Sequence, residues 1–64
     1  MMDKLRAEQI ARSFFEQQHD VHNTKAVRFE NGIWVVEGEV SSGYGENIKK
    51  LRIDAKTGKI IDVE

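Results

Sequence analysis

The chain has 64 residues, enough for one domain over residues 1–64 and too few for a second. Ten Lys and Arg residues against eleven Asp and Glu residues disfavour nucleic-acid binding, and the absence of cysteine excludes disulfides, thiolate metal ligands and a cysteine nucleophile. No apolar run approaches the roughly 20 residues of a membrane span, and Met1–Arg6 is not followed by the apolar stretch of a signal peptide, so we expect a cytoplasmic protein with no membrane insertion.

The first predicted element is an amphipathic helix over residues 3–18. Asp3 is the predicted N-cap, and Glu8 with Arg12 has the spacing of an ion pair on the solvent side. A single apolar stripe follows the i, i+3, i+4, i+7 spacing and consists of Ala7, Ile10, Ala11, Phe14 and Phe15. A lone helix of this length is marginally stable in water, so it needs a surface to pack against.

A β-hairpin is predicted next, with Asn31-Gly32 as a type I′ turn because both residues tolerate positive φ. A two-residue turn pairs Phe29 with Trp34 and Val27 with Val36. Directly paired residues share a face. The predicted helix-facing set is therefore Val27, Phe29, Trp34, Val36 and Val40. We expect Trp34 at the centre of the core, against Phe14 or Phe15.

After a loop over residues 41–46, a third strand is predicted over 47–54, with Leu51 and Ile53 facing inward. The turn over 54–58 follows, in which Asp54 can accept backbone N–H groups and Gly58 can adopt positive φ. Residues 59–64 return as a short strand, with either Ile60 or Ile61 facing the core. The predicted class is α+β, with one N-terminal helix on a three- to four-stranded antiparallel β-meander.

Residues 51–64, with the turn Asp54-Ala55-Lys56-Thr57-Gly58, resemble the end of a PepSY domain. Residues 34–37, Trp-Val-Val-Glu, look like the aromatic-valine strand of that family. The helix with Ala7, Ala11 and Phe14 lies where the family has its helix, so the resemblance covers nearly the whole chain. It implies a non-catalytic domain, without cofactor or catalytic residues, of the kind found in propeptides of thermolysin-type metallopeptidases and in bacterial envelope proteins. It also implies a protein partner, with a peptidase to be restrained as one candidate. Without an attached peptidase or export signal, the chain would be a free-standing regulatory module or an excised domain.

Catalytic groups are sparse. The hydroxyl candidates Ser41, Ser42 and Thr57 have no histidine nearby in the predicted topology, and a nucleophile needs a base within reach. Glu37 and Glu39 point the same way from one strand. They are either an acid/base pair or exposed ion-pair partners of the basic residues 50 and 52 across the sheet. A domain this small offers little room for an enclosed pocket, so we predict that it is not an enzyme.

His19 and His22 flank Asp20 and are the metal-like residues of the chain. Two imidazoles and a carboxylate can bind zinc or copper if they converge. If residues 19–22 extend the helix, both imidazoles lie on nearly one side. The alternative is a solvated helix end, where histidine suits the helix dipole. This segment and the 41–46 loop define a second functional hypothesis, a small-ligand or metal-binding domain.

The face of the sheet away from the helix is the predicted partner surface. Strand parity places Ile33 and Val35 on this face, beside Lys50 and Arg52. Apolar residues rimmed by charge indicate an interface, for another protein or for self-association. Alternatively, the stems of Lys50 and Arg52 cover the apolar residues. Tyr44, between two glycines, is either a loop anchor or a side chain folded over the core edge. Pairing through strand 47–54 or 23–30 is a second binding route.

Overall fold

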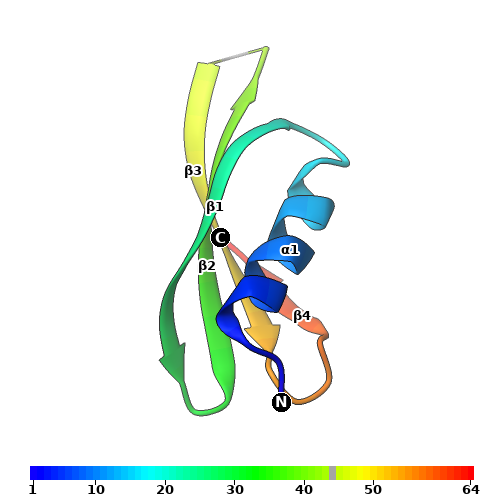
Figure 1. The fold of residues 1–64 in the computed structure, drawn as a ribbon. Helices are drawn as coiled ribbons and strands as arrows, with labels where there is room; N and C mark the ends of the chain where they lie inside the picture. The colour runs from blue at the N-terminus through cyan, green and yellow to red at the C-terminus, as the bar shows by residue number, and fades with distance from the viewer. Residues whose placement is uncertain (44) are drawn as a thin grey trace.

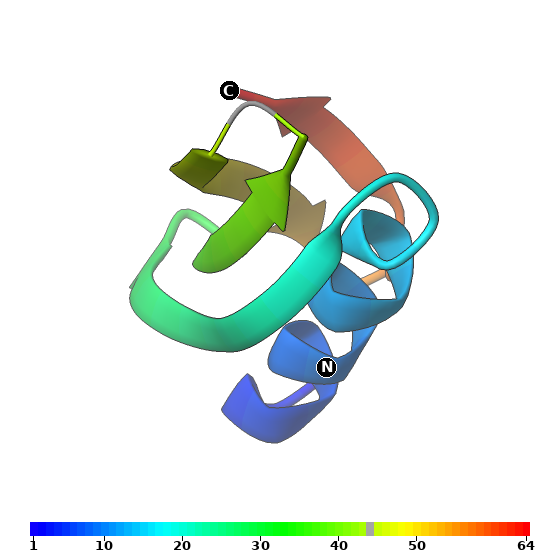
Figure 2. The ribbon, with the colours of Figure 1, turned by 90° about the horizontal axis from the view of Figure 1, so that it is seen from above.

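The computed structural model describes residues 1–43 and 45–64, and it has one helix followed by a four-stranded sheet. The helix α1 spans Lys4–Phe15, and the strands are β1 (Asp20–Glu30), β2 (Ile33–Ser42), β3 (Gly45–Asp54) and β4 (Ile60–Val63). Neighbouring strands are antiparallel in the order β1-β2-β3-β4. The helix lies on one side of the twisted sheet (Figures 1 and 2). The predicted α+β architecture is confirmed, with four strands.

The helix begins where it was predicted and ends earlier. The Asp3 carboxylate accepts the Arg6 N–H at 2.9 Å, which confirms the N-cap. At the other end, the N–H groups of Gln17 and Gln18 bond to carbonyls three residues back. Such bonds tighten and terminate the last turn. The prediction of helix to residue 18 is therefore wrong, and the strand β1 already begins at Asp20.

The core lies between the helix and the concave side of the sheet. Its fully buried side chains from β2 and β3 are Val36, Val40, Leu51 and Ile53. The helix contributes the buried residues Ala7, Ala11 and Phe15. Two alanines on the inner stripe carry only a methyl group each, so the helix backbone can approach the sheet closely. The large ring of Phe15 fits because it lies over Gly38, where the sheet has no side chain.

The first hairpin has the predicted turn and a register that changes partway along. Asn31 and Gly32 have φ of 52° and 76°, as a type I′ turn requires. Phe29 pairs with Trp34 as predicted, but a β-bulge between Ala26 and Arg28 places Ala26 opposite Val36. A bulge inserts one residue and so resets the parity of the strand. The prediction that Val27 faces the core is wrong.

Trp34 is not the centre of the core, contrary to prediction. It is half-buried at the rim, with its ring centroid 4.7 Å from that of Phe29. Its Nε1–H donates to the Met2 carbonyl at 3.1 Å. An indole N–H needs a hydrogen-bond partner when it leaves water, and the N-terminal segment supplies one at the edge of the core. Trp34 therefore fastens the N-terminus to the sheet.

The last hairpin confirms the predicted turn. The Asp54 carboxylate accepts the N–H groups of Lys56 and Thr57 at 2.8 and 3.3 Å, and Gly58 has φ of 78°. Because β4 pairs with β3 along the segment that carries Leu51 and Ile53, the prediction of a free edge is wrong for residues 50–54, whereas residues 47–49 have no such partner among the described residues. Ile60 lies opposite the buried Ile53, which assigns Ile60 to the helix-facing side.

Candidate functional site

The candidate partner surface is the side of the sheet away from α1. Ile33 and Val35 both lie on it, as strand parity predicts, because Trp34 and Val36 pair with core residues on the other side. Their accessibility differs. Ile33 is half-buried, whereas Val35 is only 6% exposed.

The burial of Val35 follows from its neighbours. Its register partners are Arg28 on β1 and Arg52 on β3, and directly paired side chains stand beside each other on one face. The aliphatic stems of arginines cover apolar surface while their guanidinium groups stay in water. The alternative of coverage by basic side chains therefore applies at Val35, with Arg28 taking the place that Lys50 was expected to hold.

Ile33 stands between two hollows of the surface. One, of about 580 Å³, is also lined by Met1, Asp54, Lys56 and Ile61. The other, of about 230 Å³, is lined by Ile33 together with the arginines that flank Val35. A branched apolar side chain with a hollow on each side can be contacted from both sides by side chains of another molecule.

Ion pairs organise the charges around this surface. Arg52 contacts Asp62 at 3.4 Å and Glu64 at 3.3 Å, so it does not form the predicted ion pair with Glu37 or Glu39. Lys50 does lie directly opposite Glu37, whereas Glu39 lies opposite Ile48. The side chains in the two pairs of Arg52 are 41–57% exposed, so each pair contributes at most about 1 kcal/mol to stability.

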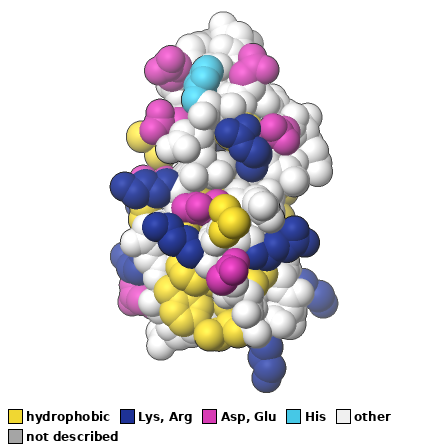
Figure 3. Space-filling model, in the orientation of Figure 1, with side chains coloured by type: hydrophobic (Ala, Val, Ile, Leu, Met, Phe, Trp, Pro, Cys, Tyr) yellow, Lys and Arg dark blue, Asp and Glu magenta, His cyan; other side chains and the backbone are white. Residues whose placement is uncertain are grey.

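Charges of both signs are intermixed elsewhere on the molecule. The face seen in Figure 3 carries Lys, Arg, Asp and Glu side by side, with hydrophobic side chains gathered toward its lower end. This mixture differs from the basic stripe typical of nucleic-acid-binding proteins. The fifth residue predicted for the partner surface, Tyr44, lies outside the described residues.

The two histidines do not lie together on a helix. His19 precedes β1 in the turn after α1, and His22 is within β1. His19 lines a hollow of about 210 Å³ on the helix side, together with Phe14, Lys49 and Val63. The described residues contain no group of three or more His, Cys, Asp or Glu side chains able to hold a metal ion. The prediction that both imidazoles lie on one side of an extended helix is wrong.

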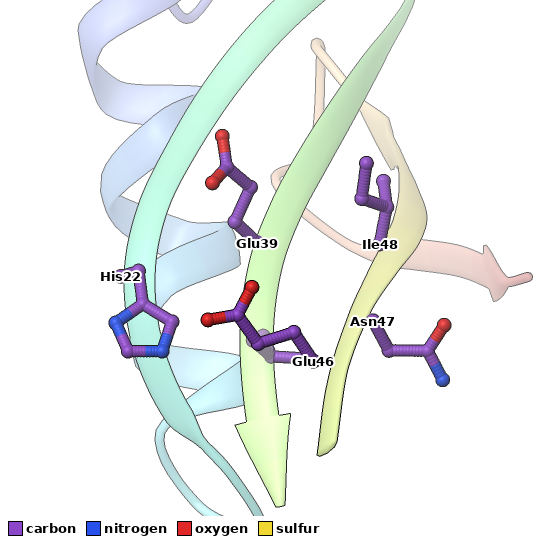
Figure 4. A pocket seen from close by; sticks show the side chains of 6 residues that line it. His22, Glu39, Glu46, Asn47 and Ile48 are labelled. Carbon is purple, nitrogen blue, oxygen red and sulfur yellow. The ribbon is translucent and has the colours of Figure 1, made fainter.

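His22 lines a different hollow, of about 480 Å³, with Glu39 and Glu46. Figure 4 shows these three side chains on three neighbouring strands. The His22 Nε2 lies 2.9 Å from the Ser41 Oγ, so the expectation that no histidine lies near a hydroxyl candidate is wrong. The bulge between Val21 and Asn23 turns His22 toward its neighbouring strand, and sequence parity cannot show such a shift.

The contact between Ser41 and His22 lacks the other parts of a hydrolytic site. In a catalytic triad the second ring nitrogen of the histidine bonds to an orienting acid. Among the described residues, the side-chain contact of His22 is the one to Ser41, and that pair is exposed. The arrangement is a surface hydrogen bond between β1 and β2.

The sequence did not indicate the contacts that Glu8 makes with β1. Glu8 was predicted to pair with Arg12 in solvent, but Arg12 contacts Glu16 at 3.4 Å. The Glu8 carboxylate instead accepts the Ala26 N–H at 2.8 Å. The Glu8 carbonyl also accepts the Thr24 hydroxyl at 3.1 Å. These contacts fasten α1 to β1 beside the bulge.

Residues 4–64 match the PepSY family, described as "Peptidase propeptide and YPEB domain". The chain belongs to this family, whose domains are generally non-catalytic and related to peptidase propeptides. No curated protein and no solved structure matches it. Within the described part of the chain, no helix has both the length and the apolar character needed to cross a membrane.

Proposed function

We propose that this protein is a non-catalytic regulatory module that binds a protein partner, and that the partner is a peptidase. The observation that carries the proposal is the family match over residues 4–64, because the description of the family names peptidase propeptides. A propeptide-like domain acts by contact with a folded partner and needs a binding surface rather than reactive groups. The exposed ion pairs and surface hydrogen bonds of this chain are consistent with that role.

The proposed contact is the outward sheet face around Ile33. Two hollows border this side chain, and Arg52 and Lys50 lie on the same face. Val35 supports the surface from below, since it is 6% exposed, and Tyr44 remains a proposed loop anchor. An apolar centre with a charged rim is the usual composition of a protein interface.

The test uses one substitution at the proposed centre and a matched one at its far end. Ile33→Lys places a charge between the two hollows. Ile48→Lys makes the same chemical change on the same face, at a side chain that is 61% exposed and opposite Glu39. Each protein is immobilised, exposed to an extract of the source cells, and washed. The bound fraction is assayed for peptidase activity before and after the partner is released.

We expect the wild type and Ile48→Lys to retain a peptidase whose activity rises on release, and Ile33→Lys to retain about tenfold less. Loss of one central apolar contact costs about 1–2 kcal/mol, which corresponds to that factor. Thermal melts of the three proteins establish that each is folded. Retention of a peptidase by all three alike would contradict the assignment to the face, and the absence of peptidase activity in every bound fraction would contradict the assignment to peptidases.

The second candidate function is the binding of a small ligand at His19. The His19 Nδ1 atom is buried and has no hydrogen-bond partner among the described residues. The hollow beside it is also lined by Phe14, Val63 and the basic residue Lys49. An apolar acid suits this combination. Phenylacetate is a suitable probe, and chemical-shift changes at His19 and Lys49 that vanish in Lys49→Ala would support binding, whereas unchanged spectra would exclude this ligand class.

A further inference from the structure

The two edges of the sheet are protected to different degrees. The β1 edge carries two bulges, and its Ala26 N–H is occupied by the Glu8 carboxylate. Bulges and covering groups are the devices by which proteins keep sheet edges from pairing with other chains. The helix packs on β1 and β2, and among the described residues no element lies beyond β4. β4 carries one bulge but no covering hydrogen bond among the described residues, so it is an open edge, together with the part of β3, residues 45–49, that β4 does not reach.

Two residues of β4 direct their backbone groups away from the sheet. Glu64 exchanges both backbone hydrogen bonds with Lys50, at 3.1 and 2.8 Å. In an antiparallel ladder, bonded and non-bonded positions alternate, so the N–H and C=O of Val63 point to the free edge. The Lys59 carbonyl accepts the Asp54 N–H at 2.8 Å, so the N–H and C=O of Ile60 also point outward.

The side chains at these positions are apolar and accessible. Ile60 and Val63 lie opposite the core residues Ile53 and Leu51, which places both on the helix side of the sheet. They are 38% and 44% exposed. On the other side of the sheet, Lys59 precedes β4 and Glu64 follows it, and the exposed Glu64 carboxylate also contacts Arg52 of its own chain at 3.3 Å.

We propose that β4 binds the β4 of a second copy of this chain, antiparallel, with Ile60 opposite Val63 and Lys59 opposite Glu64. Each pair then occurs twice, as the two-fold symmetry of an isologous dimer requires. Apolar side chains meet on the helix side, and opposite charges meet on the other. The binding partner of β4 is identified as a second copy because β4 is complementary to itself both in its apolar side chains and in its charges.

The bulge in β4 sets the spacing of the free backbone groups and does not prevent pairing. A regular strand offers its free backbone groups at every second residue. In β4 they lie at Ile60 and Val63, three apart, because Ile61 is the extra residue of the bulge between Arg52 and Ile53. The bulge absorbs the extra residue, since Ile53 and Leu51 of β3, two residues apart, pair with Ile60 and Val63, and a second β4 offers its free groups at the same two residues. The resulting dimer has one continuous sheet with both helices on the same side.

This association uses the edge of β4, which adjoins the partner surface at Ile61 and at the contact of Glu64 with Arg52, and it is expected to be weak. A strand of four residues gives an interface at the low end of the known sizes. We therefore expect a dissociation constant of about 0.1–1 mM. Sedimentation equilibrium measures it, and a dilution series of amide spectra locates it, with shifts expected at residues 59–64 and not on β1.

The charge pairs permit a test by exchange. In Lys59→Glu, both pairs of the dimer become Glu with Glu, and in Glu64→Lys both become Lys with Lys. When the two variants are mixed, each pair again joins opposite charges. Each variant alone should dimerise about tenfold more weakly than the wild type, and the equimolar mixture should form a heterodimer of near wild-type affinity. The contrast should shrink at high salt. Lys25→Glu is the control, since it reverses a charge on β1.

A second variant tests the backbone contact. Val63→Pro removes an N–H that the β3–β4 ladder does not use, and proline is tolerated on an edge strand where its nitrogen faces outward. The folded variant should show no self-association. A wild type that stays monomeric above the expected range, a mixture no tighter than its components, or shifts confined to β1 or to the face around Ile33 would each overturn the proposal. Self-association lost in Ile33→Lys but kept in Val63→Pro would assign it to the outward face instead.

Discussion

Replacing Gly38 by alanine should destabilise the protein, although glycine is usually a poor strand residue. Gly38 is buried in β2, and the ring of Phe15 lies directly over it. A Cβ atom at position 38 would lie 2.6 Å from Cε2 and 2.7 Å from Cδ2 of Phe15. Phe15 is 2% exposed, so its ring cannot move aside into solvent.

Two effects of opposite sign decide the magnitude. Removing glycine from a strand gains about 0.5–1 kcal/mol of backbone entropy. Overpacking a filled core costs about 1–3 kcal/mol. The steric overlap is therefore expected to win, with a net loss of about 1–2 kcal/mol from a total stability of about 3–10 kcal/mol for a domain of this size. The melting temperature should fall by roughly 5–15 °C.

Chemical denaturation of a double-mutant cycle with Phe15→Leu measures the coupling. Leucine lacks the ring edge that meets the new methyl group, so Gly38→Ala should cost less in that background. Gly43→Ala is the control, because nothing lies within 4 Å of a Cβ built there. The packing explanation would be refuted if Gly38→Ala stabilised the protein, or if its cost were the same with Phe15 and with Leu at position 15.

Three further changes test other contacts. Glu8→Ala should lower stability by about 1–2 kcal/mol and speed amide exchange at Ala26. Glu8→Gln keeps a carbonyl oxygen that can accept the Ala26 N–H, so it should lower stability less. Equal losses in the two variants would show that this hydrogen bond does not stabilise the fold. Trp34→Phe removes the N–H that donates to Met2 and should lower stability by about 1 kcal/mol with faster N-terminal proteolysis, so unchanged proteolysis would contradict the tether. Zinc titration followed by histidine resonances should give no response shared by both rings, because they line different hollows; a joint response lost in His19→Ala would restore the metal hypothesis.

Local chemistry made the turns and the helix start predictable from the sequence. Asn31-Gly32 and Asp54 with Gly58 direct the backbone through their own conformational preferences and short-range hydrogen bonds. Asp3 caps the helix in the same local way. These interactions involve residues a few positions apart, so they do not depend on the rest of the fold.

The sequence predicted which side of the sheet carries the candidate surface, but it did not predict how exposed each side chain on that side is. Strand parity placed Ile33 and Val35 on the outward face, because side chains alternate strictly along a regular strand. Whether an outward side chain is accessible depends on what stands beside it on neighbouring strands. Arg28 lies beside Val35 in the register that the two-residue turn sets, and Arg52 lies beside it through the pairing of β3 with β2, which the sequence does not specify. The burial of Val35 is therefore a property of the sheet.

The sequence by itself determined the order of elements, the turns, the helical stripe and the family. The tertiary structure decided which residue of β1 enters the core, where Glu8 bonds, that His22 meets Ser41, and which strand edge stays open. Those outcomes depend on groups far apart in the chain, such as the Glu8 carboxylate and the Ala26 N–H, whose meeting requires the helix to be docked on the sheet. Hydrophobic periodicity and secondary-structure propensity depend on residues that are close in sequence. Contacts between distant groups form only when the whole domain is folded.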